Sequence, residues 1–197
     1  MQYLKWDKFR DTLLDKEILY FSLYDLETLF KAHSKSLSRF ISRKAQEGKL
    51  TRLKKNLYCL SEKIPGDFTL ANIVYQPSYV SLESALSHYS IIPESVYAIT
   101  SITTKPTREF GITGRSFYYQ TIKKSAFLGY EPTVIFNETV LLATKEKALA
   151  DYLYFVSRGT KSLNDRTDWS RVDINKVKSY LRKDFNLAEL KIQKLIP

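Results

Sequence analysis

Cysteine, histidine and long apolar runs are scarce in this 197-residue chain, which has one Cys and two His. Cys59 has no partner for an intramolecular disulfide, and one cysteine cannot build a cysteine-based zinc site. His33 and His88 lie far apart, without the spacing of metal ligands. No run approaches the roughly 18 apolar residues that cross a bilayer, and the charged N-terminus lacks the apolar core of a signal peptide. We therefore expect a cytoplasmic protein.

Motifs of nucleotide-binding loops and catalytic sites are missing too. Neither GxxxxGK followed by Ser or Thr nor GxGxxG occurs. Ser84 and His88 stand four residues apart on a predicted helix and could touch, but neither a nucleophile elbow nor an orienting acid accompanies them. The glutamates of residues 131–146 lack the spacing of a metal-dependent nuclease. We predict no enzymatic activity and no cofactor, and we assign Ser84 and His88 a packing or surface role.

Glycine and proline are also few, at six each, while 44% of the residues are hydrophobic and 26% are charged. Such a composition favours folded cores over disorder. The length suits one large or two small domains. A turn signal at residues 61–67, which contains Pro65 and Gly66, is the best candidate for a boundary. We therefore predict two domains, at residues 1–64 and 65–197.

The stretch from residue 22 to residue 48 predicts two short helices with a tight connection. Ser22 and Asp25 have the spacing of a capping box at the start of the first. Ser36 can cap the second, and Gly48 suits the left-handed residue that ends it. An apolar stripe on the second helix is expected from Leu37, Phe40, Ile41 and Ala45. Lys44 falls on this apolar side, where its stem can pack while its ammonium reaches solvent.

Residues 49–60 predict a basic β-hairpin after these helices. Its apolar residues flank a tip of Lys54, Lys55 and Asn56, and asparagine tolerates the positive φ that a hairpin turn needs. A further helix is expected over residues 3–16, as the third member of a bundle. Two helices followed by a hairpin are typical of a winged helix-turn-helix, which places its second helix in the DNA major groove.

Basic charge is concentrated in this region. Between residues 31 and 55 nine basic residues face one acid, Glu47, so the segment carries +8 of the chain's net +10. One sign of charge beside Ser and Gln side chains is the footprint of a phosphate-binding surface. The DNA-binding candidates are Lys35, Ser36, Ser38, Arg39, Ser42, Arg43, Arg52, Lys54, Lys55 and Asn56. The alternative is a protein-interaction module whose basic surface meets an acidic partner.

The remainder of the chain predicts an α+β domain with a mainly antiparallel sheet and flanking helices. Strands are expected at residues 96–104 and in hairpins at 108–122 and 134–143. Helices are expected after Ser81, Thr144 and Asp173, and a last one after a capping box of Asn186 and Glu189.

Tyrosine is abundant, with 14 residues, ten of them in the predicted second domain. Aromatic side chains on strands can stack on single-stranded bases, so RNA binding is a competing interpretation. The simpler interpretation is that these rings fill a half-buried sheet and keep their hydroxyls in water.

Three segments carry a resemblance to a known family. Residues 76–104, QPSYVSLESALSHYSIIPESVYAITSITT, resemble a characteristic block of AbiEi-type antitoxins. Residues 52–60, RLKKNLYCL, and residues 147–154, KALADYLY, are similar to two further segments of that family. The departures are Asn56, where the family often has glycine, and a divergent tail after Gly159.

The resemblance implies a transcriptional regulator and antitoxin of a type IV, abortive-infection toxin–antitoxin pair. It implies an N-terminal winged helix-turn-helix that binds inverted repeats in double-stranded DNA upstream of its own operon. It also implies a second domain that counters a nucleotidyltransferase-like toxin encoded beside it, with or without direct contact. Only the DNA-binding half of this expectation is also supported by charge and element order.

Overall fold

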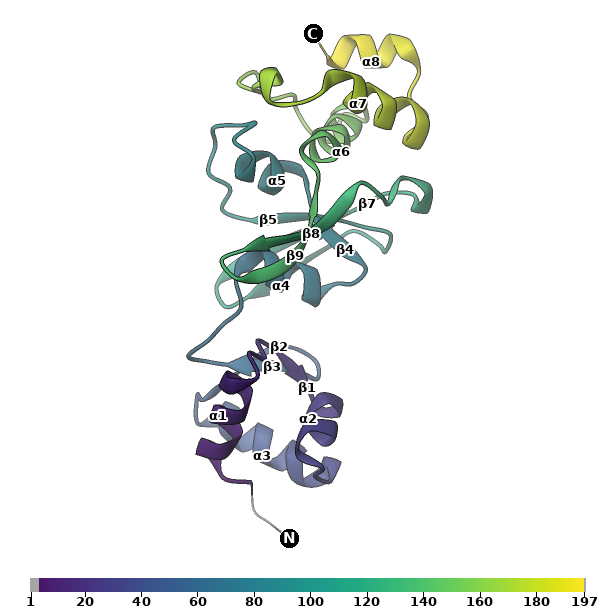
Figure 1. Ribbon diagram of the computed structural model, residues 1–197. Helices are drawn as coiled ribbons and strands as arrows, with labels where there is room; N and C mark the ends of the chain where they lie inside the picture. The colour runs from purple at the N-terminus through teal and green to yellow at the C-terminus, as the bar shows by residue number, and fades with distance from the viewer. Residues whose placement is uncertain (1–3, 197) are drawn as a thin grey trace. The chain divides into compact units, whose positions relative to one another are not determined.

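The computed structural model describes residues 4–196 and separates the chain into two compact units, Met1–Gly66 and Asp67–Pro197 (Figure 1). The boundary predicted between residues 64 and 65 lies just before this division. The chain is of mixed α+β type. No helix within residues 4–196 has both the length and the apolar character that crossing a membrane requires.

Within residues 4–66 the first unit combines three helices with a small antiparallel sheet whose strand order is β1-β3-β2. Its elements are α1 (Trp6–Asp15), β1 (Phe21–Ser22), α2 (Leu23–Phe30), α3 (Ser34–Gln46), β2 (Leu50–Lys54) and β3 (Leu57–Leu60). Every one of them contributes to a single core. Phe9 of α1 lies at the centre of this core, with its ring centre 5.2 Å from that of Phe40 in α3 and 5.6 Å from that of Phe21 in β1. This packing fixes α3 against the rest of the unit.

The start of α2 confirms the predicted capping box. The Ser22 hydroxyl accepts a hydrogen bond from the backbone N–H of Asp25 at 3.2 Å. In return, the Asp25 carboxylate accepts one from the backbone N–H of Ser22 at 2.7 Å. Two N–H groups that would otherwise lack partners are therefore satisfied at the point where the chain leaves β1.

Replacing Ser22 by alanine should lower the free energy of unfolding of the first unit by about 1 kcal/mol, because the N-cap acceptor is lost. Urea denaturation followed by Trp6 fluorescence measures this, with Trp169 changed to Phe in all proteins so that one reporter remains. Ser38→Ala, at an exposed serine inside α3, is the control and should cause no loss. Equal losses for the two variants would contradict the assigned role of Ser22.

The second unit contains a six-stranded sheet within residues 67–196, in the order β6-β7-β5-β4-β9-β8. Its strands are β4 (Ser78–Val80), β5 (Ile99–Thr103), β6 (Arg108–Ile112), β7 (Arg115–Thr121), β8 (Tyr130–Ile135) and β9 (Glu138–Ala143). Hairpins β6–β7 and β8–β9 confirm the two predicted ones. The sheet is mainly antiparallel, but β5–β7 and β4–β9 pair in parallel, because helices separate β4 from β9 and an edge hairpin turns β7 back onto β5.

Helices cover both faces of this sheet: α4 (Asp67–Val74) lies on one, and α5 (Leu82–His88) and α6 (Lys145–Ser157) lie on the other (Figure 1). The later elements, α7 (Ile174–Ser179), a π-helical turn η3 (Tyr180–Asp184) and α8 (Glu189–Leu195), pack against α6. Short 3-10 turns lie at η1 (Lys124–Ala126) and η2 (Trp169–Arg171). The mixed α+β class with flanking helices is thus confirmed for this part of the chain.

Of the four helix starts predicted in this unit, two are right, the one at Ser81 is right in position alone, and the last is wrong. Thr144 and Asp173 are N-caps whose side chains accept backbone N–H groups of α6 and α7. The capping box of Asn186 and Glu189 is wrong, because α8 begins at Glu189 after Ala188. Asn186 instead ends the preceding helical segment in a left-handed conformation, with φ of 58°. Asparagine tolerates this conformation, which the sequence prediction did not consider.

A fully buried ion pair joins α6 to the centre of the sheet. The Lys147 ammonium contacts the Asp151 carboxylate one turn away, and neither side chain is exposed. Asp151 also accepts hydrogen bonds from the hydroxyls of Tyr79 (3.0 Å) and Ser81 (2.8 Å). Burial raises the pKa of the Asp151 carboxyl above its ordinary value, against the opposing effect of Lys147. Ser81 does occupy the predicted N-cap position of α5, but its hydroxyl bonds Asp151 rather than the helix.

Candidate nucleic-acid interface

The connection between α2 and α3 consists of residues 31–33. Lys31 ends α2 in a left-handed conformation (φ 48°, ψ 41°), and His33 is the N-cap of α3. The prediction that Ser36 caps this helix is wrong. The N-cap is His33, three residues earlier, and the N–H groups of Ser36 and Leu37 both donate to its carbonyl, at 3.0 and 3.1 Å. Ser36 lies in the first turn, exposed.

One side of α3 is buried in the core, and the opposite side consists of polar and basic residues. Leu37, Phe40 and Ile41 are buried, as their spacing predicted. The exposed residues of the helix include all the candidates predicted there, namely Lys35, Ser36, Ser38, Arg39, Ser42 and Arg43, together with Gln46. The structure therefore brings these six candidates onto one exposed helix surface, which we call the α3 face.

The hairpin β2–β3 carries the other four candidates. Lys55 and Asn56 form its turn, and Asn56 has the predicted positive φ, 60°. The side chains of Arg52, Lys55 and Asn56 are exposed, while Lys54 is half-buried. A register shift between Arg52 and Lys54 marks a bulge, across which the Arg52 Nε donates to the Lys54 carbonyl at 3.4 Å. The hairpin thus presents basic groups near its tip.

Glu47, the single acid between residues 31 and 55, forms ion pairs with three of the nine basic residues of that segment. Its carboxylate accepts from the Lys44 ammonium at 2.7 Å, lies 3.2 Å from the Lys49 ammonium, and is approached by the Arg43 Nε at 3.7 Å. The hydrogen bond from Lys44 lowers the pKa of the Glu47 carboxyl. Both lysine ammoniums also lie over the Trp6 ring, at 5.8 and 5.5 Å from its centre. These ion pairs were not predicted from the sequence.

Lys44 confirms the prediction that its stem packs on the apolar side of α3. Only 8% of the residue is exposed, and its ammonium reaches the surface at Glu47. Lys44 therefore adds little to the charge that an approaching phosphate meets. Residues 31–55 therefore expose less positive charge than their net charge of +8 suggests.

Comparison with known proteins does not assign this chain to a family. No family model matches the chain, and no curated protein matches it. The function must therefore be argued from the residues of the chain and their arrangement.

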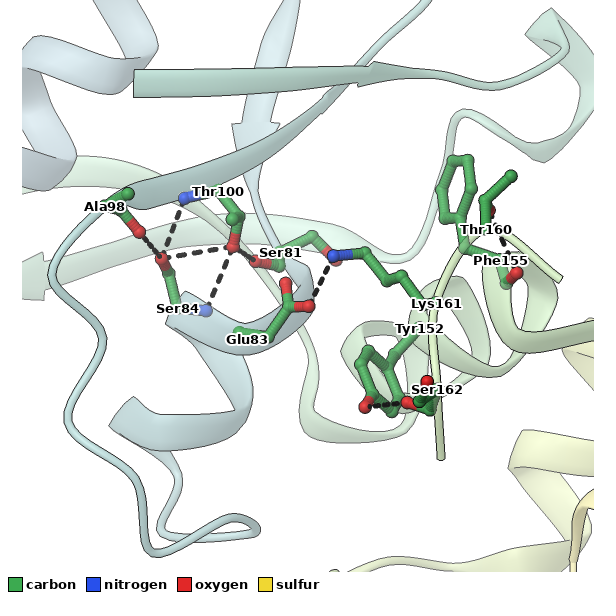
Figure 2. Close-up of polar contacts among 10 residues, drawn as sticks. All are labelled: Ser81, Glu83, Ser84, Ala98, Thr100, Tyr152, Phe155, Thr160, Lys161 and Ser162. Carbon is green, nitrogen blue, oxygen red and sulfur yellow. Dashed lines mark hydrogen bonds and ion pairs between the residues drawn. The ribbon is translucent and has the colours of Figure 1, made fainter. Parts of the chain in front are cut away.

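The pair of Ser84 and His88 is not arranged as a nucleophile and its base. Ser84 is buried at the start of α5, where its hydroxyl accepts from the backbone N–H of Thr100 at 2.8 Å (Figure 2). Its backbone N–H donates to the Thr100 hydroxyl at 3.0 Å. The His88 ring packs against Phe68, with ring centres 5.9 Å apart, and burial lowers the pKa of its imidazole. Both residues are thus engaged in packing α5 onto its surroundings.

The loop after α6 is tied to α5 beside this pair. The Lys161 ammonium contacts the Glu83 carboxylate, and the Tyr152 hydroxyl donates to the Ser162 carbonyl at 2.6 Å (Figure 2). Within residues 4–196 no group of three or more His, Cys, Asp or Glu side chains is placed to hold a metal ion.

The tyrosines of the second unit range from completely buried to almost fully exposed. Tyr79 and Tyr119 are completely buried, and the Tyr119 hydroxyl donates to the Ala71 carbonyl at 2.7 Å. Burial raises the pKa of both phenols. Their hydroxyls are therefore bonded inside the protein rather than kept in water, which corrects part of the simpler interpretation. Tyr97, which is 95% exposed, lies outside the strands, and Tyr118 on β7 is 38% exposed. Within residues 67–196 the strands therefore offer one exposed tyrosine for stacking on RNA bases.

Proposed function

We propose that the first unit is a winged helix-turn-helix and that the chain is a sequence-specific, DNA-binding autorepressor. The observation that carries this proposal is the α3 face, an exposed helix surface on which polar and basic side chains occur without an acid until Glu47. A helix backed by a core and presenting such a face fits the B-DNA major groove, and the β2–β3 hairpin would be the wing beside it.

The side chains of the α3 face divide by the contacts that they can make. Arg39 and Arg43 can pair bidentately with the O6 and N7 atoms of guanine, which reads sequence directly. Lys35, Ser38 and Ser42 can add contacts to base edges or phosphates. The hairpin residues Arg52, Lys54, Lys55 and Asn56 would hold the phosphate backbone or enter the minor groove. Phosphate contacts fix the register, and base contacts specify the sequence.

The salt dependence of binding counts the phosphates involved. A monomer that neutralises about five phosphates should give a slope near −4.5 for log K against log salt concentration. Fluorescence anisotropy on a labelled duplex, repeated across a salt series, measures this slope. A slope between zero and about −1 would mean that the basic surface does not lie along the DNA, and would contradict the proposed docking.

The antitoxin role is the second part of the proposal, and it rests on the resemblance of residues 76–104 and 147–154 to AbiEi-type antitoxins. The functional partner would be a nucleotidyltransferase-like toxin encoded next to this chain. Co-expression tests this role: growth arrest by the neighbouring gene product should be relieved by the full chain. The same cells can carry a reporter under the operon's own promoter, which the chain should repress. Relief without repression would leave an antitoxin that does not regulate itself.

A further inference from the structure

The ion pairs at the end of α3 suggest a role for the acid that interrupts the basic region. Arg39, Arg43 and Glu47 follow one another at four-residue intervals, so Glu47 continues the line of the two guanidinium groups along the helix. A duplex lying along the α3 face would therefore meet a carboxylate where the line of arginines ends. The negative charge of this carboxylate is opposite to that of the arginine and lysine side chains that bind phosphate.

The three cations paired with Glu47 differ in how far their side chains are exposed. Lys44 is almost wholly buried, whereas the side chains of Lys49 and Arg43 are 43% and 65% exposed. Lys49 is nevertheless held between the Glu47 carboxylate at 3.2 Å and the Trp6 ring. Without the carboxylate, a lysine with a flexible four-carbon stem could turn to a nearby phosphate.

We propose that Glu47 is a specificity determinant of the α3 face: it withholds Lys49 from the DNA backbone and so limits sequence-independent binding. The inference rests on the proposed DNA-binding function. Sequence-independent affinity comes almost entirely from phosphate contacts, each of which adds about 0.9 to the salt slope. A protein that keeps this contribution low retains a larger ratio between its specific and non-specific affinities.

The test is a set of variants titrated on the chain's own upstream duplex and on a scrambled duplex. Glu47→Gln should bind the scrambled duplex about eightfold more tightly at 0.1 M salt, with a slope steeper by about 0.9, as one added phosphate contact predicts. Binding to the upstream duplex should rise less, because base contacts already fix its register, so the specificity ratio should fall. Glu62→Gln, an equal charge change at an exposed acid outside α3, is the matched control. It should change neither the affinity for the scrambled duplex nor the salt slope.

Lys49→Gln identifies the cation, and its effect in the wild-type chain does not depend on the folding of the Glu47 variant. In the wild-type chain this change should alter scrambled-duplex affinity less than about twofold, because Lys49 is already paired. In the Glu47→Gln chain it should remove the gain. Thermal unfolding of each variant confirms that the unit is intact, and a glutamine oxygen can still accept from Lys44.

Two results would overturn this inference. One is an equal gain for Glu47→Gln and Glu62→Gln on the scrambled duplex. The other is a large loss for Lys49→Gln in the wild-type chain. Both are read on the scrambled duplex, whereas the proposed function is judged by the wild-type preference for the upstream duplex, so the two claims fail separately.

Discussion

Replacing Arg39 by alanine is expected to weaken binding to the upstream duplex by about 1–3 kcal/mol, or roughly 5- to 150-fold. Arg39 is exposed on the α3 face, where a guanidinium group can pair with guanine in the major groove. The loss should be much smaller on duplexes in which the contacted guanine is replaced. Anisotropy titrations over single-base variants of the duplex would show both the loss and the position that Arg39 reads.

The stability of the first unit should be unchanged in this variant, because an exposed arginine outside the core contributes within about ±0.5 kcal/mol. Arg10→Ala is the matched control, since it removes the same charge from α1, where Arg10 pairs with Asp11. It should affect both duplexes weakly and equally. If Arg39→Ala bound specific and scrambled duplexes as the wild type does, Arg39 would not belong to the reading surface.

Replacing Asp151 by alanine is expected to lower the free energy of unfolding of the second unit by about 3–5 kcal/mol. The change leaves the Lys147 ammonium fully buried without its carboxylate, and it removes the acceptor for the hydroxyls of Tyr79 and Ser81. An unpaired charge inside a protein costs far more than the pair contributes. Urea denaturation followed by Trp169 fluorescence, with Trp6 changed to Phe throughout, reports this unit.

A double variant separates the loss of charge pairing from the loss of packing. Lys147→Met with Asp151→Asn removes both charges, and the asparagine carbonyl can still accept from Tyr79 and Ser81. It should recover most of the stability lost in Asp151→Ala, because no unpaired charge remains. A double variant as unstable as Asp151→Ala would show that the buried charge is not the cause.

Local structure could be predicted from the sequence wherever neighbouring residues determine the backbone conformation. Ser22 and Asp25 form their capping box within one helical turn, and Asn56 takes the positive φ of a two-residue turn. The burial of Lys44 followed from its place in the helical period. One such local prediction failed: His33, not Ser36, is the N-cap of α3, because the helix already begins at Ser34.

Features that depend on distant parts of the chain could not be predicted in this way. The parallel pairing of β5 with β7 follows from the packing of the whole sheet, whereas sequence spacing indicated only the hairpins. The bond from Ser81 to Asp151 joins residues far apart in sequence, so a serine at a helix start gave no sign of it. The ion pairs of Glu47 are different, because Arg43, Lys44 and Lys49 lie within four residues of it and helical spacing could have indicated the first two. Only the contact of the two lysine ammoniums with the Trp6 ring depends on a distant element, α1.

The central claim is that the α3 face reads a DNA sequence, and a comparison of two duplexes tests it most directly. Fluorescence anisotropy of the wild-type chain should be measured on its own upstream DNA and on a scrambled duplex of equal length, as the salt concentration is raised. The account predicts tighter binding to the upstream duplex, with a preference that persists while non-specific binding weakens. Equal and steeply salt-sensitive binding to both duplexes would contradict it, and the basic surface would then be an electrostatic patch for another partner.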